Sequence, residues 1–345
     1  MTKSKHKKNT PKKGAARKKT SGKPKSGKLG AKPILIAVII AIGAILVWKF
    51  MLPSSSTGPA GPDKEYKVGP ADLCKYSPAL ITAYNLEQPV ALDFTQRGFT
   101  GMRLIEVRED GSGRVLQLPS WDDAGHLGLY ALDRRGHVYT TPIPHISLQD
   151  NKPEEQNRVY KIDSQTGDMK VFAELPWAKP PSINNPFGAL GIAYDCDTES
   201  IYVSSVAGSG PKEELGRIFQ IDLKTGEILD QVDGIDVIGV GVFTTKTGKK
   251  LFCGSARQPD IYTISLDEKG GFAGEPEFML SLIEEAGGSY DKGQRIRFFE
   301  DNRMEIKGVD FNYSLMVASD PMRNVYNFQY DEVADSWTFL GVYKQ

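Results

Sequence analysis

Hydrophobic and polar positions follow two different patterns along this chain. Between Ile34 and Leu52 the residues are almost all apolar, and the run before Lys49 is unbroken for 15 residues. Further along, short segments alternate apolar and polar residues and are separated by Gly, Asp and Asn. The first pattern predicts one transmembrane helix at 34–52. The second predicts a domain built from β-strands.

The basic residues next to the apolar run predict its orientation. The first 52 residues hold 14 Lys and Arg and no Asp or Glu. Positive flanks stay in the cytoplasm, so residues after 52 should lie on the periplasmic or extracellular side of an inner (cytoplasmic) membrane. A cleaved signal peptide is the alternative, but the 33 residues before the run are long for one, and no Ala-x-Ala follows. We therefore expect an uncleaved, single-pass signal anchor.

Residues 1–33 are rich in Lys, Gly, Pro, Ser and Thr and have no apolar face, which predicts a disordered cytoplasmic tail. Such a tail attracts anionic lipid. Its composition also resembles the tails of histone H1-like proteins, which leaves nucleic acid as an alternative ligand for the tail. Residues 53–72, rich in Pro, Ser and Gly, are expected to form a linker, and 73–345 a separate domain.

Two windows in the domain repeat each other. Residues 158–172 and 217–229 each contain an alternating strand, a turn that ends in Thr-Gly, and a second alternating strand. This pattern predicts a β-hairpin, because Gly supplies the positive φ of the turn. Weaker copies of the same outline stand at 103–111, 261–270 and 325–331.

A second type of hairpin precedes most of these windows. It opens with Gly and apolar residues and closes with an apolar-aromatic strand, and its copies stand at 128–141, 191–205, 239–254 and 308–319. Two hairpins in succession make a four-stranded meander, so the fold class is all-β, a β-propeller of five to six four-stranded blades. A pair of β-sandwiches is the alternative, but it does not explain the recurring order. Residues 281–302 are expected to form an insertion between blades.

Charge limits the ligands of the domain. After the 14 basic residues of the first 52 are removed, 29 basic and 43 acidic residues remain, a formal net charge of −14. Nucleic acid and anionic membrane surfaces are therefore not expected to bind the propeller.

The three cysteines, Cys74, Cys196 and Cys253, are too far apart for a CxxC motif. One disulfide could form, and the spacing leaves the pairing open. Cys253 lies within an apolar strand and is expected to face a blade interface.

Two segments, Gly191-Ile-Ala-Tyr-Asp with Ile201-Tyr-Val-Ser-Ser and Gly308 to Asp331, resemble repeats of the six-bladed NHL and gluconolactonase (strictosidine-synthase-like) propellers. The resemblance implies a divalent cation in the central pocket, held by oxygen ligands of the kind that suit calcium. Asn185 and Asp310 come closest to those ligands. The Asn that the family places directly before the Gly is Leu190 in one repeat and Lys307 in another.

Two functions follow from these observations. Because the sequence contains no G-x-S-x-G and no P-loop, we rank first a non-catalytic binding or scaffold module for a protein, peptide or glycan partner. Its contacts would come from the propeller faces and the 281–302 segment. The alternative is a calcium-dependent lactonase or esterase-like hydrolase, in which the metal polarises a carbonyl and activates water. No catalytic residue is assigned.

Overall fold

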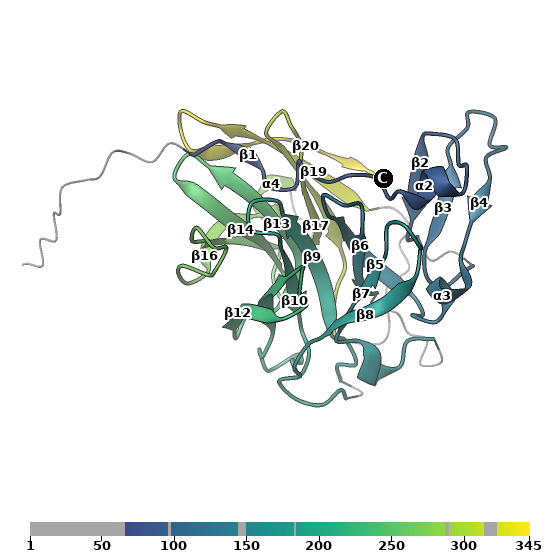
Figure 1. The fold of residues 1–345 in the computed structure, drawn as a ribbon. Helices are drawn as coiled ribbons and strands as arrows, with labels where there is room; N and C mark the ends of the chain where they lie inside the picture. The colour runs from purple at the N-terminus through teal and green to yellow at the C-terminus, as the bar shows by residue number, and fades with distance from the viewer. Residues whose placement is uncertain (1–65, 96–97, 144–149, 183, 287–289, 314–322) are drawn as a thin grey trace, which may run out of the picture. The chain divides into compact units, whose positions relative to one another are not determined.

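A computed structural model of the chain describes residues 66–345 except 96–97, 144–149, 183, 287–289 and 314–322 (Figure 1). The predicted tail, the predicted anchor at 34–52 and most of the predicted linker therefore lie outside the described residues. Within the described part of the chain, none of the helices combines the length and the apolar character needed to cross a membrane.

The described chain forms five antiparallel sheets in sequence order, which we call blades 1 to 5 (Figure 1). Blade 1 contains β2 (Val90–Asp93), β3 (Arg103–Glu106) and β4 (Val115–Leu116). Blade 2 contains β5 (Leu127–Leu132), β6 (Val138–Pro142), β7 (Arg158–Ile162) and β8 (Met169–Glu174). Blade 3 contains β9 (Ala189–Asp195), β10 (Ser200–Ser205), β11 (Arg217–Asp222) and β12 (Ile228–Asp233).

Blade 4 contains β13 (Val237–Thr245), β14 (Gly248–Ser255), β15 (Asp260–Ser265) and β16 (Glu277–Ser281), and β1 (Gly69–Pro70) joins it beside β13. Blade 5 contains β17 (Lys292–Phe298), β18 (Arg303–Val309), β19 (Asn324–Asp331) and β20 (Ser336–Lys344). Short helices are α2 (Leu80–Ala83), α3 (Pro119–Asp122), η1 (Pro153–Glu155) and α4 (Leu282–Ala286). The predicted β-propeller is confirmed with five blades, and the β-sandwich alternative is wrong.

The Thr-Gly hairpins are confirmed at both strong windows. β7 pairs with β8 and β11 pairs with β12, and the turns between them contain Gly167 at φ 77° and Gly226 at φ 76°. In each turn an aspartate, Asp163 or Asp222, accepts hydrogen bonds from two main-chain N–H groups that follow it. The local sequence therefore fixes these turns without help from distant parts of the chain.

Four hydrophobic clusters join successive blades. Strand β10 shows how: Ile201 and Val203 point into the cluster with blade 2, whereas Tyr202 between them points into the cluster with blade 4. All six residues of β10 are buried. A blade between two others needs apolar side chains on both faces, so its central strands lose the simple alternation of a half-exposed sheet.

The prediction that 281–302 forms an insertion between blades is wrong for the second half of that segment. Residues 292–298 of that segment are β17, the first strand of the blade, and 303–309 form its partner β18. The predicted first hairpin at 308–319 is wrong in register, because Gly308 lies near the end of β18 and pairs with Gly293. The remainder of that hairpin, from residue 314, lies outside the described residues. Three charged residues in β17 interrupt its apolar pattern, so the sequence did not indicate a strand there.

Blade 5 is packed differently on its two faces. Ile296, Phe298 and Met304 belong to the cluster with blade 4. Alternate positions of the same strands carry polar side chains, and we call this second surface the free face of blade 5; its residues include Arg295, Arg297, Arg303, Glu305, Lys307 and Asn327. Among the described residues, no hydrophobic cluster joins this face to blade 1.

The end of the predicted linker belongs to the folded domain. Gly69 and Pro70 pair with Thr244 and Phe243 of β13, so the chain enters the propeller as an added strand of blade 4. Ala71 N–H then donates to the carbonyl of Val242 at 3.2 Å. The boundary of the folded chain therefore lies before residue 69 rather than at 73.

Candidate functional site

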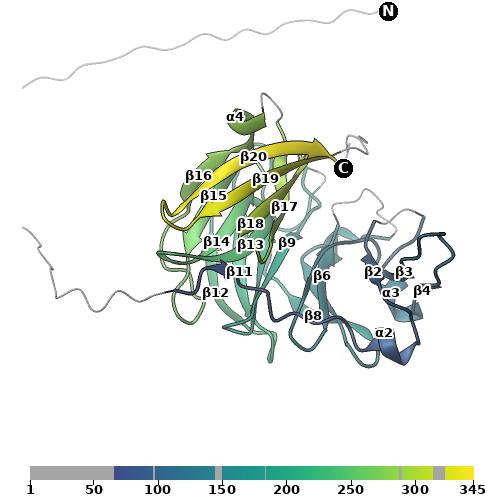
Figure 2. The same ribbon diagram turned by 90° about the horizontal axis from the view of Figure 1, so that it is seen from above.

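The first strands of blades 3, 4 and 5 approach one another closely (Figure 2). A Cβ added to Gly191 would lie 3.1 Å from Cα of Gly239, and one added to Gly239 would lie 2.3 Å from the carbonyl oxygen of Gln294. Only glycine permits such an approach of main chains. The glycines that open the predicted hairpins therefore bring three inner strands into contact near their amino-terminal ends.

The inner strands separate towards their carboxyl ends and enclose a cavity of about 330 Å³. Its walls are residues 129–132 of β5, 192–194 of β9, 240–242 of β13 and 295–299 of blade 5, together with Asp72 and Lys75. We call this cavity the central pocket. Because four blades contribute to it, the pocket is a product of the closed arrangement of the sheets, and it is the candidate functional site.

Residues 69–76, which we call the strap, run across the carboxyl ends of the inner strands. The Cys196 N–H, just after β9, donates to the carbonyl of Ala71 at 2.9 Å. The Tyr76 N–H donates to the carbonyl of Asp133, just after β5, at 3.1 Å. With the β1–β13 pairing, the strap contacts blades 4, 3 and 2 in turn and forms part of the pocket wall.

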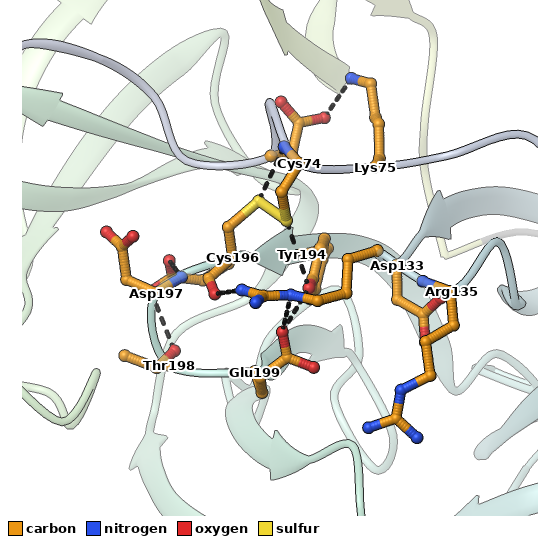
Figure 3. The surroundings of a disulfide bond; sticks show 12 residues. Cys74, Lys75, Asp133, Arg135, Tyr194, Cys196, Asp197, Thr198 and Glu199 are labelled. Atoms are coloured by element: carbon orange, nitrogen blue, oxygen red, sulfur yellow. Dashed lines mark hydrogen bonds and ion pairs between the residues drawn. A yellow bond between two sulfur atoms is a disulfide. The ribbon is translucent and has the colours of Figure 1, made fainter.

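A disulfide between Cys74 and Cys196 fixes the strap to blade 3 (Figure 3). Their Cα atoms are 6.0 Å apart, and the residues are separated by 122 positions in the sequence. The side chain of Arg134 contacts both the Cys196 carbonyl and Glu199, and Glu199 accepts a hydrogen bond from the Tyr194 hydroxyl at 2.9 Å. The sequence allowed one disulfide, and the structure supplies its pairing.

The third cysteine is placed as the sequence predicted. Cys253 is free and fully buried, in the cluster between blades 3 and 4. Burial raises the pKa of its thiol, so the thiolate is disfavoured. Cys253 therefore acts as a small apolar side chain in a blade interface.

Four charged residues line the described wall of the pocket, two from the strap and two from β17. Arg295 and Arg297 lie two residues apart, on the same face of the strand, and both line the cavity. Asp72 is the only carboxylate among the described lining residues, and it pairs with Lys75. Neither arginine forms an ion pair with a carboxylate in the described part of the chain. The pocket therefore carries an excess of positive charge.

The surroundings of Arg295 disfavour its charge. Burial and, to a smaller extent, the neighbouring charge of Arg297 together lower the pKa of its guanidinium to about 10. The guanidinium lies over the ring of Tyr130 from β5, 5.2 Å from the ring centroid. At neutral pH Arg295 is still a cation, because a pKa of about 10 leaves it protonated.

More positive charge continues from the pocket onto the free face of blade 5. Lys307 pairs with Arg295 in the register of β17 and β18. Burial lowers the pKa of the Lys307 ammonium, and the charges of Arg323, Arg295 and Arg297 act in the same direction. The three arginines are therefore close enough to Lys307 to disfavour its charge.

The two residues considered as metal ligands are placed as follows. The Asn185 side chain is buried, donates to the carbonyls of Val206 and Ser209 at 2.7 and 2.9 Å, and accepts from the Phe187 N–H at 2.9 Å. Asp310 is exposed just after β18. The segments that carry them do meet, since the rings of Phe187 and Phe311 are 5.8 Å apart.

The side chain of Asn185 is thus occupied in holding a turn. Across the described residues, no group of three or more His, Cys, Asp or Glu side chains is arranged to hold a metal ion. The chemistry of the described donor set therefore gives the calcium hypothesis no support, and the ligand roles of Asn185 and Asp310 stay predictions.

Sequence reasoning missed both pocket arginines. It assigned their segment to an insertion, because Lys292, Arg295 and Arg297 interrupt the apolar pattern of an inner strand. The usable signal was the alternation itself: Ile296 and Phe298 stand between the charged positions at a period of two. That pattern predicts a strand with one polar face.

No protein-family model matches the sequence, and no curated protein matches it. Among solved structures, the PQQ-bound aldose sugar dehydrogenase of Streptomyces coelicolor is similar at 10% identity with a TM-score of 0.41, over 69% of this chain and 74% of that one. A glucose dehydrogenase is similar at 12% identity with a TM-score of 0.38, over 64% of this chain and 72% of that one.

The structure described as the Dos1 propeller is similar at 10% identity with a TM-score of 0.37. The similarity covers 73% of this chain and 56% of that one, so this chain spans little more than half of the Dos1 propeller structure. At these identities and scores, no functional residue is transferred from any of the three proteins.

Proposed function

We propose that this chain is a membrane-anchored, extracytoplasmic β-propeller that acts as a non-catalytic binding module, with a protein, peptide or glycan partner held at the central pocket. The predicted helix at 34–52 would fix it in the inner membrane. The basic tail at 1–33 would stay in the cytoplasm and contact anionic lipid.

The chemistry of the pocket wall carries this proposal. The wall consists of main chain and apolar side chains from four inner strands, with Tyr130 and two arginines. Hydrolysis by side chains needs a nucleophile or a general base near the substrate. Asp72, the only carboxylate among the described lining residues, already pairs with Lys75. Such a pocket can hold and orient a ligand better than it can transform one.

The disulfide supports the proposed location. Disulfides persist in the periplasm and outside the cell and are rare in the reducing cytoplasm. The Cys74–Cys196 bond fixes the strap that borders the pocket. The same side of the membrane follows from the basic residues before the predicted anchor, so two independent features favour it.

Site-specific photo-cross-linking in cells tests the proposal. A photoreactive amino acid would replace Lys75, which lines the pocket and is exposed, or Val333, which is 88% exposed at the β19–β20 turn. A partner in the pocket predicts an adduct from position 75 and none from position 333. Adducts from both positions, or from neither, would contradict the proposed site.

Protease added to spheroplasts that produce the full-length chain tests the location. The propeller should be digested from outside, while an epitope placed before residue 34 is protected. Protection of the propeller would place it in the cytoplasm and contradict the topology.

A further inference from the structure

We propose that the ligand of the central pocket is an acidic segment of a partner protein, bound in an extended conformation with two carboxylates, two residues apart, on Arg295 and Arg297. This assignment rests on the proposed binding function and names the chemical class of its ligand. The charge of the pocket, the spacing of the two arginines and the adjoining free face of blade 5 each favour such a ligand.

Charge is the first argument. Arg295 is removed from water and lies beside a second cation, while the only carboxylate among the described lining residues pairs with Lys75. A buried cation without an anionic partner is unfavourable for the folded protein. A ligand carboxylate would relieve this, because guanidinium and carboxylate form short, paired hydrogen bonds. The pocket is therefore suited to an anion.

Spacing is the second argument, and it favours a peptide over a single small anion. Arg295 and Arg297 are alternate residues of one strand, so their side chains leave the same face about 7 Å apart. Carboxylates at positions i and i+2 of an extended peptide have the same spacing, for the same reason. Two adjacent acidic residues would point to opposite faces and could not reach both arginines.

The free face of blade 5 extends the pocket. Lys307 lies opposite Arg295 on β18. Beyond it a shallow hollow is lined by Arg303 and Glu305, which pair with each other, and by the apolar residues Leu340 and Val342, which are 58% and 43% exposed. Apolar side chains that follow the second acid and leave the same face of the peptide as the two acids can lie against Leu340 and Val342. A surface of this kind suits an acidic segment that also has aliphatic side chains.

A second copy of this chain is a less suitable occupant. Two copies meeting through the free face would bring their arginines and lysines together, and like charges oppose such contact. An acidic partner would be attracted by the same residues.

Calorimetric titration of the full-length protein in nonionic detergent provides the test. The probes are acetyl-Gly-Glu-Val-Glu-Val-Gly-amide, its isomer acetyl-Gly-Glu-Glu-Val-Val-Gly-amide, and the first peptide with Gln in place of Glu. The first two have the same charge and composition. The basic tail therefore cannot distinguish them by charge, whereas the spacing of Arg295 and Arg297 can.

We expect the alternating peptide to bind at least tenfold more tightly than its isomer and than the Gln peptide. Arg295→Gln combined with Arg297→Gln should remove this difference. Lys212→Gln combined with Lys224→Gln changes the charge equally at two exposed positions and should preserve it. If the arginine double variant fails to fold, the affinities of the wild-type protein for the two Glu peptides still test whether the pocket distinguishes their spacing.

Four outcomes would overturn the assignment. Equal affinity for the two Glu peptides would show that the pocket does not distinguish the spacing of the two carboxylates. Inorganic phosphate or tetragalacturonate binding as tightly as the alternating peptide would assign the pocket to small anions or acidic glycans. Self-association that the arginine double variant abolishes would assign the arginines to contacts between copies. A pocket cross-link without peptide binding would leave the proposed function standing and reject only the acidic peptide.

Discussion

The guanidinium of Arg295 lies over the ring of Tyr130, with 5.2 Å between its central carbon and the ring centroid. The ring of Phe94 also stacks on Tyr130, with 4.7 Å between the ring centroids and an angle of 18° between the planes. Arg295 belongs to blade 5, Tyr130 to blade 2, and Phe94 directly follows β2 of blade 1. A cation and two aromatic rings therefore connect blade 5 to blades 1 and 2 beside the pocket.

Replacing Arg295 with Met should stabilise the free protein. The change removes a buried cation and retains much of the side-chain volume, so the free energy of unfolding should rise by about 1 kcal/mol. Thermal unfolding should show an increase of about 2 °C. The control is Arg135→Met at an exposed position, which should have almost no effect. A clear loss of stability would show that Arg295 is needed for packing rather than kept for a ligand.

Removing the disulfide should destabilise the domain. Cys74 and Cys196 close a long loop, so replacing both with Ala should lower the free energy of unfolding by about 3 kcal/mol. Thermal unfolding with and without dithiothreitol measures the effect. The reductant should lower the melting temperature of the wild type to that of the double variant and leave the variant unchanged. A wild type unaffected by full reduction would be inconsistent with a stabilising bond.

Close approach of the inner strands predicts a strong effect of Gly239→Ala. The added Cβ would lie 2.3 Å from the Gln294 carbonyl oxygen, so the strands must move apart, at a cost of about 2 kcal/mol. Gly210→Ala is the matched control, because a Cβ at that position has no atom within 4 Å. Urea unfolding measures both variants. Equal midpoints for the two variants would contradict the close packing of β13 and β17.

Protonation of His137 should make the free energy of unfolding depend on pH. Its Nδ1 accepts a hydrogen bond from the Ser164 N–H at 2.9 Å, and burial lowers the pKa of the imidazole below its ordinary value of 6.5. The folded protein therefore binds this proton less readily than the unfolded chain. This contribution to stability is complete above pH 6.5 and decreases as the pH falls below it.

Melting temperatures between pH 8 and pH 5 test the role of His137. In His137→Asn the amide oxygen can accept the Ser164 hydrogen bond without titrating, so its stability should fall less over this range than that of the wild type. Parallel curves for the two proteins would assign the pH dependence to other groups.

Asn185→Ala tests the two roles considered for this residue. Because three hydrogen bonds of the side chain hold a turn, the variant should lose about 2 kcal/mol of stability both in EDTA and in millimolar calcium. Asp310→Ala, at an exposed position, should change little. A calcium-dependent rise in the wild-type melting temperature that both variants abolish would favour the hydrolase alternative.

The sequence alone determined the repeated hairpins. Gly167 and Gly226 have the positive φ that their turns require, and the aspartates of those turns bind nearby N–H groups. These interactions are local, so the residues that form them are neighbours in the sequence. The order of the hairpins then indicated a propeller, because a meander that exposes two apolar faces must pack against another on each side.

Only the tertiary structure decided the pairing of Cys74 with Cys196, the strap and the pocket. These contacts join residues as far apart as 122 positions, and local patterns contain no information about which distant segments meet. The misassignment of β17 has the same origin. Arg295 and Arg297 contradict the pattern of an inner strand when read locally, and their position is explained only once four blades enclose the cavity that receives them.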